Sequence, residues 1–173
     1  DKIDNINISG LSYENKNILL REIKNLNLQN IFMINVYELK KIINNNTLIE
    51  RYKIFKKYPS SLKIDIQKTT FLAKINNNNK IFLVGSNGKF TNAKLYDQDL
   101  PFIFGKPDIK EFLEFKKIID RSKISYDQVE NIYYFQSGRW DLKLKKNIYL
   151  KLAKNNLNIS LDNDFEFISY NNI

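Results

Sequence analysis

The sequence predicts an α+β fold, with the order strand, helix, helix, strand, strand from residue 3 to about residue 75 and a second, strand-rich region after it. Two observations support this fold class. Residues 52–75 contain two segments of alternating apolar and polar residues around Pro-Ser-Ser, which is the pattern of a β-hairpin with one buried face. Residues 14–26 and 36–43 instead repeat apolar residues every three or four positions, which is typical of amphipathic helices.

The predicted hairpin has one apolar and one basic face. The residues expected on its buried face are Tyr52, Ile54, Tyr58, Leu62, Ile64 and Ile66. Lys63, Asp65 and Gln67 fall on the other face, because successive side chains of a strand point to opposite sides. Pro59 is expected to start the turn while the ring of Tyr58 packs at the strand end. The alternative is that Tyr58 anchors a partner.

The elements before the hairpin have sequence signals at their ends. Residues 6–8 alternate before Gly10, which predicts a short first strand and a turn. Ser12 stands where the N-cap of the first helix is expected. Asn35 and Glu38 have the spacing of a capping box at the start of the second helix.

The second region is predicted to form a sheet with one helix. Its expected elements are a strand at 81–84, a turn at 86–88, an apolar segment at 100–104, a helix at 108–120 capped by Asp108, and strands at 129–135, 140–144 and 148–152. Segment 100–104 is assigned to a sheet edge, because Pro101, Gly105 and Pro107 bound it. Lys145-Lys146-Asn147 is expected to join the last two strands as a hairpin.

The C-terminal stretch allows two structures. Ser160 could cap a last helix, which is the preferred interpretation, or residues 165–170 could form a strand. Asp162-Asn163-Asp164 has the spacing that begins a calcium loop, but the required Gly and distal Glu do not follow. These acids are therefore assigned to the start of the helix.

The composition excludes several classes of enzyme. The chain has 173 residues, of which 43% are hydrophobic, enough to bury a core, and it contains neither Cys nor His. Disulfides, thiolate nucleophiles, Ser-His-Asp triads and the usual zinc ligand sets are therefore excluded. No run of about 18 or more apolar residues is present, so a membrane-spanning helix is not expected within this sequence.

The charge is positive and uneven. The net charge is +9, and residues 1–84 carry 14 Lys or Arg against 7 Asp or Glu. A basic half could bind nucleic acid or an anionic membrane surface. The preferred interpretation is a solvated lysine-rich face, because the lysines alternate with the buried residues and do not cluster with exposed aromatic residues.

Two further patterns that suggest chemistry fail on closer comparison. Gly85 to Lys89 resembles part of a phosphate-binding loop, but Leu83 and Phe90 break the required pattern, so a hairpin turn is expected. Glu111 and Glu114 are assigned to a solvated helix surface. The sequence therefore predicts no catalytic, cofactor-binding or metal-binding residues, and no enzyme.

Taken in order along the chain, several motifs resemble the extracytoplasmic region of the FtsQ/DivIB family of bacterial cell-division proteins. The matching positions are Ile8 to Gly10; Lys56, Tyr58, Pro59, Leu62 and Ile64; Leu72-Ala73; Gly85 to Gly88; Leu100, Pro101 and Gly105; Arg139 to Leu144; and Ile148 to Leu152. The resemblance spans about 150 residues. It implies a POTRA domain over residues 1–76 and a mixed β domain with a largely antiparallel sheet over residues 77–173.

The resemblance also implies a role and a location. The chain is expected to be a non-enzymatic divisome scaffold that recruits and holds FtsB- and FtsL-like division proteins during septum assembly. It is expected on the periplasmic side of the bacterial inner membrane, held by an N-terminal helix outside this sequence, without cofactor and without nucleic acid. Relative to the family, the sequence is expected to stop before the closing strand or strands of the β domain.

The contact residues carried over from the resemblance lie on one predicted strand. They are Arg139, Trp140, Asp141 and Lys143. For Arg139 and Trp140 a role in the core alone and a role at a partner surface both remain open; an exposed guanidinium can pair with a carboxylate of a partner. The alternative functions are a POTRA-containing component of an outer-membrane insertion or secretion pore, and a basic nucleic-acid-binding domain.

Overall fold

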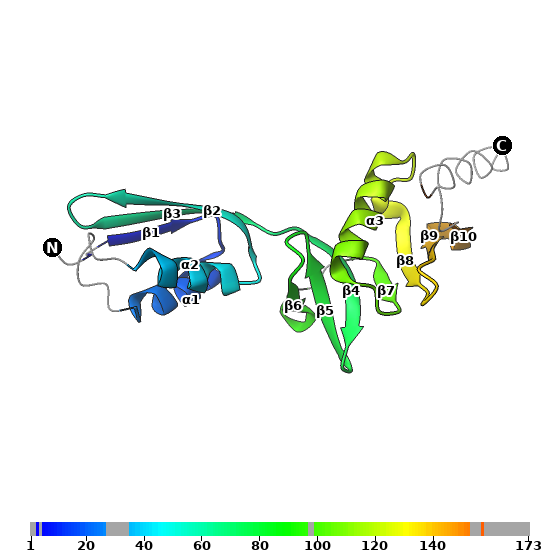
Figure 1. Cartoon of the computed structure of the whole chain (residues 1–173), viewed down its shortest axis with the longest axis horizontal. Coiled ribbons are helices and arrows are strands. Elements are labelled where there is room, and N and C mark those ends of the chain that lie inside the picture. The colour runs from blue at the N-terminus through cyan, green and yellow to red at the C-terminus, as the bar shows by residue number, and fades with distance from the viewer. Residues whose placement is uncertain (1–2, 4, 27–34, 97–98, 153–156, 158–173) are drawn as a thin grey trace. The chain divides into compact units, whose positions relative to one another are not determined.

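The computed structural model describes residues 3, 5–26, 35–96, 99–152 and 157 (Figure 1). The chain divides into two compact units, Asp1–Thr70 and Phe71–Ile173. Each unit has its own cluster of buried apolar side chains. No helix among the described residues is long and apolar enough to cross a membrane.

The first unit has the predicted order of elements. These are β1 (Asn5–Ser9), α1 (Tyr13–Lys24), α2 (Val36–Asn45), β2 (Ile49–Lys57) and β3 (Ser61–Lys68). Strand β3 is central, parallel to β1 and antiparallel to β2. Both helices lie on one side of this sheet (Figure 1).

The core of the first unit follows the predicted periodicity. Its fully or nearly fully buried side chains are Ile8, Leu19, Ile23, Leu39, Ile43, Ile49, Leu62, Ile64 and Ile66. The two strands of the hairpin therefore turn alternate apolar residues toward the helices, as expected. Burial of these side chains from both layers is the main force that holds the unit together.

The helix ends show one confirmed cap and one correction. The side chain of Asn35 accepts hydrogen bonds from the backbone N–H groups of Tyr37 and Glu38, so Asn35 caps α2 as predicted. Ser12 stands at the N-cap position of α1, but its hydroxyl makes no capping hydrogen bond. It accepts one from the side chain of Asn15 instead.

The turn of the first hairpin differs from the prediction at Tyr58. The turn occupies residues 58–60, and the Tyr58–Pro59 peptide bond is cis. The side chain of Tyr58 is 62% exposed and does not pack into the core. The alternation predicted its burial, but β2 ends at Lys57, so Tyr58 already belongs to the turn.

The second unit begins earlier than predicted. Its elements are β4 (Phe71–Asn77), β5 (Lys80–Gly85), β6 (Phe90–Asn92), η2 (Ala93–Leu95), β7 (Phe102–Phe104), α3 (Ile109–Arg121), η3 (Tyr126–Gln128), β8 (Val129–Tyr134), β9 (Trp140–Leu144), η4 (Lys145–Asn147) and β10 (Ile148–Lys151). The predicted boundary at residue 76 is too late, because β4 pairs with β5 and β7 of the second sheet. The alternating pattern continues from the hairpin into β4, so the sequence does not show where the first sheet ends and the second begins.

The second sheet has seven strands in the order β10-β9-β8-β7-β4-β5-β6. Pairing is antiparallel except for the two parallel pairs that β7 makes with β4 and β8. The largely antiparallel sheet is therefore confirmed. The prediction that segment 100–104 lies at an edge was wrong: Pro101 and Gly105 flank β7 and leave its own backbone free to pair on both sides.

The core of the second unit lies between the sheet and α3. Asp108 caps α3 as predicted, accepting a hydrogen bond from the backbone N–H of Lys110. Phe112, Phe115 and Ile119 of this helix are buried. The predicted C-terminal helix from Ser160, and the alternative strand at 165–170, lie outside the described residues.

Two glycines of the family-like motifs fill positions that no other residue fits. Gly10 has a φ of +91°, and a Cβ there would lie 1.8 Å from the carbonyl oxygen of Ile66. Gly105 has a φ of +100°, and a Cβ there would lie 2.3 Å from the carbonyl oxygen of Tyr134. Because glycine has no Cβ, the chain can turn at the end of a strand while its backbone stays in close contact with the adjacent strand.

Candidate functional site: an open sheet edge beside Arg139

The four residues predicted to contact a partner lie next to one end of the second sheet. Trp140, Asp141 and Lys143 belong to β9, and Arg139 directly precedes it. Strand β10 pairs with β9 and has no second neighbour among the described residues. A terminal strand presents unpaired backbone N–H and C=O groups along its free side.

The register shows which backbone groups of β10 point outward. The N–H of Leu152 donates to the carbonyl of Trp140 at 3.2 Å, so these two residues form a hydrogen-bonded pair. Hydrogen-bonded pairs recur at every second position of an antiparallel ladder. Leu150 therefore also bonds toward β9, while the backbone groups of Tyr149 and Lys151 face the free side.

Arg139 is accessible but already engaged. It closes a turn in which the N–H of Phe135 donates to its carbonyl at 3.0 Å. Its guanidinium lies over the Phe135 ring, 4.3 Å from the centroid, and donates to Oδ2 of Asp141 at 3.1 Å. The side chain remains 44% exposed. A partner carboxylate could therefore reach the guanidinium without displacing the stacked ring.

Asp141 does not follow the alternation of buried and exposed residues that was predicted for β9. Strand β9 was predicted to expose Asp141, but only 8% of the residue is accessible. Its Oδ2 accepts from Arg139, whereas its Oδ1 has no hydrogen-bond partner among the described residues. A buried oxygen without a donor costs free energy, and this atom lies too deep for a partner at the surface to reach it.

Trp140 lies in the core and not at the surface. Trp140 is 2% exposed, and its ring stacks on the ring of Phe115 with centroids 4.4 Å apart. The ring of Tyr134 also packs against it at 4.6 Å. Of the two interpretations left open by the sequence, the structure supports the core role for Trp140.

Lys143 and Tyr149 lie opposite one another on β9 and β10. The ammonium of Lys143 donates to Glu130 at 3.0 Å, and this hydrogen bond raises the pKa of Lys143. Tyr149 is 60% exposed. Tyr149 was not predicted as a contact residue, although its position between the inward-facing Ile148 and Leu150 indicates an outward-facing side chain.

An aromatic cluster on the same sheet was also missed. Phe104 is 44% exposed and stacks on Tyr133 with centroids 5.1 Å apart, and Phe102 packs against Phe104 at 4.9 Å. These rings alternate with the buried Ile103 and Ile132, so they lie on the sheet face away from α3. They were overlooked because β7 was assigned to an edge.

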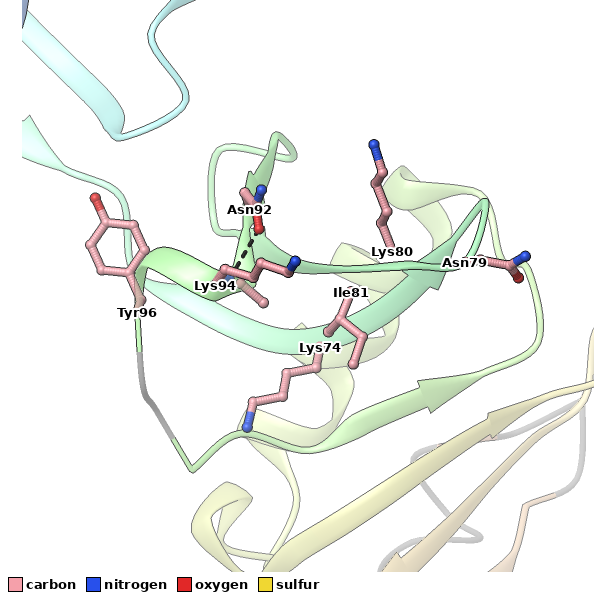
Figure 2. Close-up of a pocket in the computed structure, with 8 residues that line it drawn as sticks. Lys74, Asn79, Lys80, Ile81, Asn92, Lys94 and Tyr96 are labelled. Carbon is pink, nitrogen blue, oxygen red and sulfur yellow. Dashed lines mark hydrogen bonds between the residues drawn. The ribbon is translucent and has the colours of Figure 1, made fainter.

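A groove at the other end of the sheet does not have the features of an active site. Its volume is about 730 Å³, and its lining residues are Lys74, Asn79, Lys80, Ile81, Asn92, Ala93, Lys94 and Tyr96. Figure 2 shows the amino groups of Lys74 and Lys80 pointing in different directions. None of the described lining residues is a carboxylate that could act as a base, and the amino groups of Lys74 and Lys80 do not meet at one point.

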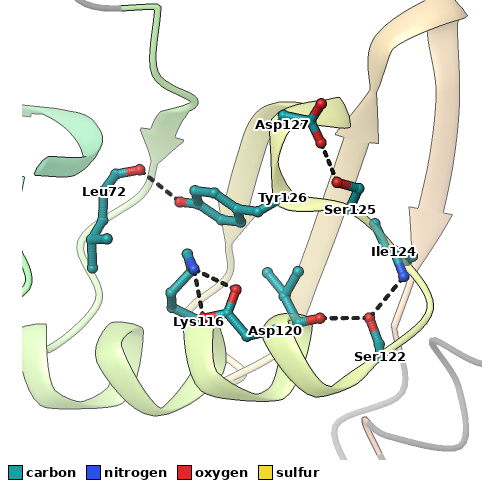
Figure 3. Close-up of polar contacts among 9 residues, drawn as sticks. Leu72, Lys116, Asp120, Ser122, Ile124, Ser125, Tyr126 and Asp127 are labelled. Carbon is teal, nitrogen blue, oxygen red and sulfur yellow. Dashed lines mark hydrogen bonds and ion pairs between the residues drawn. The ribbon is translucent and has the colours of Figure 1, made fainter. Parts of the chain in front are cut away.

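The titratable groups around the loop after α3 serve the fold (Figure 3). The hydroxyl of Tyr126 donates to the carbonyl of Leu72 at 2.7 Å, and burial raises the pKa of this hydroxyl. The ammonium of Lys116 lies 4.0 Å from the centre of the Tyr126 ring and pairs with Asp120 at 2.7 Å. The hydroxyl of Tyr126 is committed to holding the loop against β4.

Within the part of the chain that the structure describes, no group of three or more acidic, His or Cys side chains could hold a metal ion.

Comparisons with known proteins find a family match for the first unit. Residues 2–68 match the family model described as POTRA domain, FtsQ-type. No curated protein matches the chain. Eight chains of solved structures match, among them the major extracytoplasmic domain of the trans isomer of the bacterial cell-division protein DivIB from Geobacillus stearothermophilus. That match has 14% identity and a TM-score of 0.40, and it covers 54% of this chain and 85% of the other, which is too weak to assign the second unit.

Proposed function

We propose that this chain is a member of the FtsQ/DivIB family of bacterial cell-division proteins and acts as a non-enzymatic scaffold of the division machinery. The match of residues 2–68 to the FtsQ-type POTRA model supports this proposal. In this role the second unit holds a segment of an FtsB-like partner, with an FtsL-like protein in the same assembly. The chain works on the periplasmic side of the inner membrane. The described residues offer no catalytic constellation that would favour an enzyme.

The observation that carries this proposal is the side of β10 that has no neighbouring strand among the described residues. An extended partner segment can add a strand there, because Tyr149 and Lys151 direct their backbone groups away from β9. Strand addition takes affinity from backbone hydrogen bonds and specificity from the side chains beside them. It requires no catalytic group and no cofactor.

Side chains near this edge supply the specificity. The exposed ring of Tyr149 can pack against an added strand, and large aromatic residues are enriched at protein interfaces. Arg139 can pair with an acidic residue of the partner, because its side chain is 44% exposed. The edge therefore favours a partner segment with apolar and acidic side chains.

Proline substitution tests strand addition directly. Tyr149→Pro removes one outward N–H but leaves the bonds of Leu150 to β9 intact, and proline is tolerated on an edge strand. Binding of an FtsB-like periplasmic segment, measured by calorimetry, is expected to weaken at least about tenfold. Tyr149→Ala keeps the N–H and is expected to lose less affinity than Tyr149→Pro.

A proline at the opposite edge is the matched control. Phe90 lies on β6, the other terminal strand of the sheet, so Phe90→Pro places the same change where no partner strand is proposed. Circular dichroism establishes that each variant is folded. Equal binding by Tyr149→Pro and the unaltered chain, or an equal loss in Phe90→Pro, would reject β10 as the docking strand.

Arg139→Glu tests the side-chain contribution separately. Reversal of this exposed charge is expected to weaken binding of the same segment when the segment carries an acidic residue. This effect should shrink as salt is added. If Arg139→Glu binds normally while Tyr149→Pro does not, strand addition stands and the contact of Arg139 is rejected.

A further inference from the structure

The sheet of the first unit has one face that its helices do not cover. The outward-facing side chains of its three strands are Asn5, Asn7 and Ser9; Arg51, Lys53, Phe55 and Lys57; and Ser61, Lys63, Asp65 and Gln67. Across the strands, Lys53 lies opposite Asp65 and Phe55 lies opposite Lys63. This set is called the basic sheet face below.

The basic sheet face carries a net charge of +3, from four cations (Arg51, Lys53, Lys57 and Lys63) and one carboxylate. That carboxylate, Asp65, is already bound on both sides. The ammonium of Lys63 and the hydroxyl of Ser9 each donate to it at 2.7 Å, and the hydrogen bond from Lys63 is the main reason that its pKa is lowered.

The remaining cations of this face are available for a ligand. Among the described residues, Arg51, Lys53 and Lys57 form no salt bridge within 4.0 Å, and all three are exposed. They stand on one strand at alternate or near-alternate positions, so their charged groups project from the same side of the sheet. The arrangement is a flat array of cations and not a closed pocket.

One large apolar side chain lies within this array. Phe55 is 43% exposed, and the ammonium of Lys63 lies 5.6 Å from the centre of its ring. An exposed aromatic residue framed by lysines suits a boundary between water and a bilayer, where the ring enters the headgroup layer. The long lysine stems can extend their ammonium groups to neighbouring phosphates at the same time.

We propose that the basic sheet face binds the surface of a bilayer containing anionic phospholipids. Charge complementarity favours such a surface, since each Lys or Arg near an anionic membrane strengthens binding by about fivefold. Single-stranded nucleic acid is less well matched, because its binding sites combine a groove with several aromatic residues on which bases stack. A single ring on a flat face does not provide such a platform.

Vesicle sedimentation with the 173-residue chain tests this proposal. Vesicles of phosphatidylglycerol and phosphatidylcholine in equal amounts are expected to bind the chain, and vesicles of phosphatidylcholine alone are not. Lys53→Glu with Lys57→Glu is expected to weaken binding by roughly thirtyfold or more. Asp65→Asn removes the only carboxylate of this face and is expected to strengthen it by about fivefold.

The matched control changes the net charge by the same amount elsewhere in the unit. Lys40→Glu with Lys41→Glu alters two exposed residues of α2, on the other side of the sheet, and is expected to bind vesicles nearly as well as the unaltered chain. Phe55→Ala leaves the charge unchanged and is expected to weaken binding by severalfold, an effect that added salt does not abolish. Circular dichroism confirms that the variants fold.

Three results would overturn the proposal. The first is no binding to anionic vesicles at about 0.1 M salt. The second is an equal loss in the control on α2, which would indicate attraction by net charge alone. The third is binding to a polyglutamate peptide or to single-stranded DNA that depends on Lys53 and Lys57 while vesicles do not bind. That result would assign the face to an acidic protein or to a nucleic acid.

Discussion

Gly105 illustrates how single residues of this chain act through the backbone. It follows β7 with a positive φ, and the carbonyl of Tyr134 on β8 occupies the space that a side chain would need. Gly10 has the same relation to Ile66 in the first unit. Both positions belong to motifs that resemble the FtsQ/DivIB family, and both are explained by geometry without any chemical role.

Gly105→Ala is expected to destabilise the second unit by about 3 kcal/mol or more, since a left-handed backbone and a clash with a fixed carbonyl add together. Gly88→Ala is the matched control. Gly88 also has a positive φ, but its Cβ would meet only side-chain atoms at 3.5 Å, so a loss of about 1–2 kcal/mol is expected. Urea unfolding measures both, and equal losses would contradict the proposed clash.

Asp65 makes the stability of the first unit depend on pH. Hydrogen bonds from Lys63 and then Ser9 lower the pKa of Asp65 below its ordinary value of 3.8. A carboxyl whose pKa is lower in the folded than in the unfolded protein stabilises the folded state. This stabilisation is complete at pH values above the pKa of the unfolded protein, and it is lost as the pH falls through the pKa of the folded protein. The free energy of unfolding of Asp65→Asn should therefore fall below that of the unaltered chain at neutral pH and approach it below about pH 4.

Urea titrations of both proteins from about pH 7 to about pH 2 measure this difference. A difference that does not change with pH would mean that the ionised form of Asp65 contributes nothing to folding.

At the scale of elements, local patterns predicted the helices and most strands, but not their neighbours in space. The cap of α2 by Asn35 and the buried face of β3 depend on residues close in sequence, and both were predicted. The central place of β7 depends on pairing with β4 and β8, which the sequence of β7 does not encode. The burial of Asp141 was missed for a related reason, since alternation alone places it on an exposed face.

The loop after α3 shows how a distant contact holds an element. The hydroxyl of Tyr126 reaches the carbonyl of Leu72 at the start of β4, 54 residues earlier in the chain. Tyr126→Phe removes only this hydroxyl and leaves a carbonyl without its donor, so the unit should lose about 1–2 kcal/mol in thermal or urea unfolding. Tyr13→Phe alters a ring that is 80% exposed and should have little effect. Equal stability of Tyr126→Phe and the unaltered chain would reject the proposed role.

At the scale of the whole molecule, the chain is two units with separate cores. The first unit has the features of a POTRA domain of the FtsQ type, as the sequence motifs indicated. The place where the units join could not be predicted, because β3 and β4 share the same alternating pattern and only two residues separate them. The sheet to which a strand belongs is decided by its partners.

The corrected boundary predicts which fragments fold. A fragment of residues 71–173 retains β4 between β5 and β7, whereas a fragment of residues 77–173 lacks most of this inner strand. The longer fragment should unfold cooperatively in circular dichroism, and the shorter should not. Cooperative unfolding of the shorter fragment would contradict the assignment of β4 to the second unit.

Hydrogen exchange of individual backbone amides tests the proposed scaffold function most directly. In the free chain the N–H groups of Tyr149 and Lys151 face away from β9 and should exchange rapidly with solvent, while that of Leu150 should be protected. Addition of an FtsB-like periplasmic segment should slow exchange at Tyr149 and Lys151, with no change at Phe90 on the opposite edge. Binding that leaves these two amides unprotected would contradict strand addition at β10.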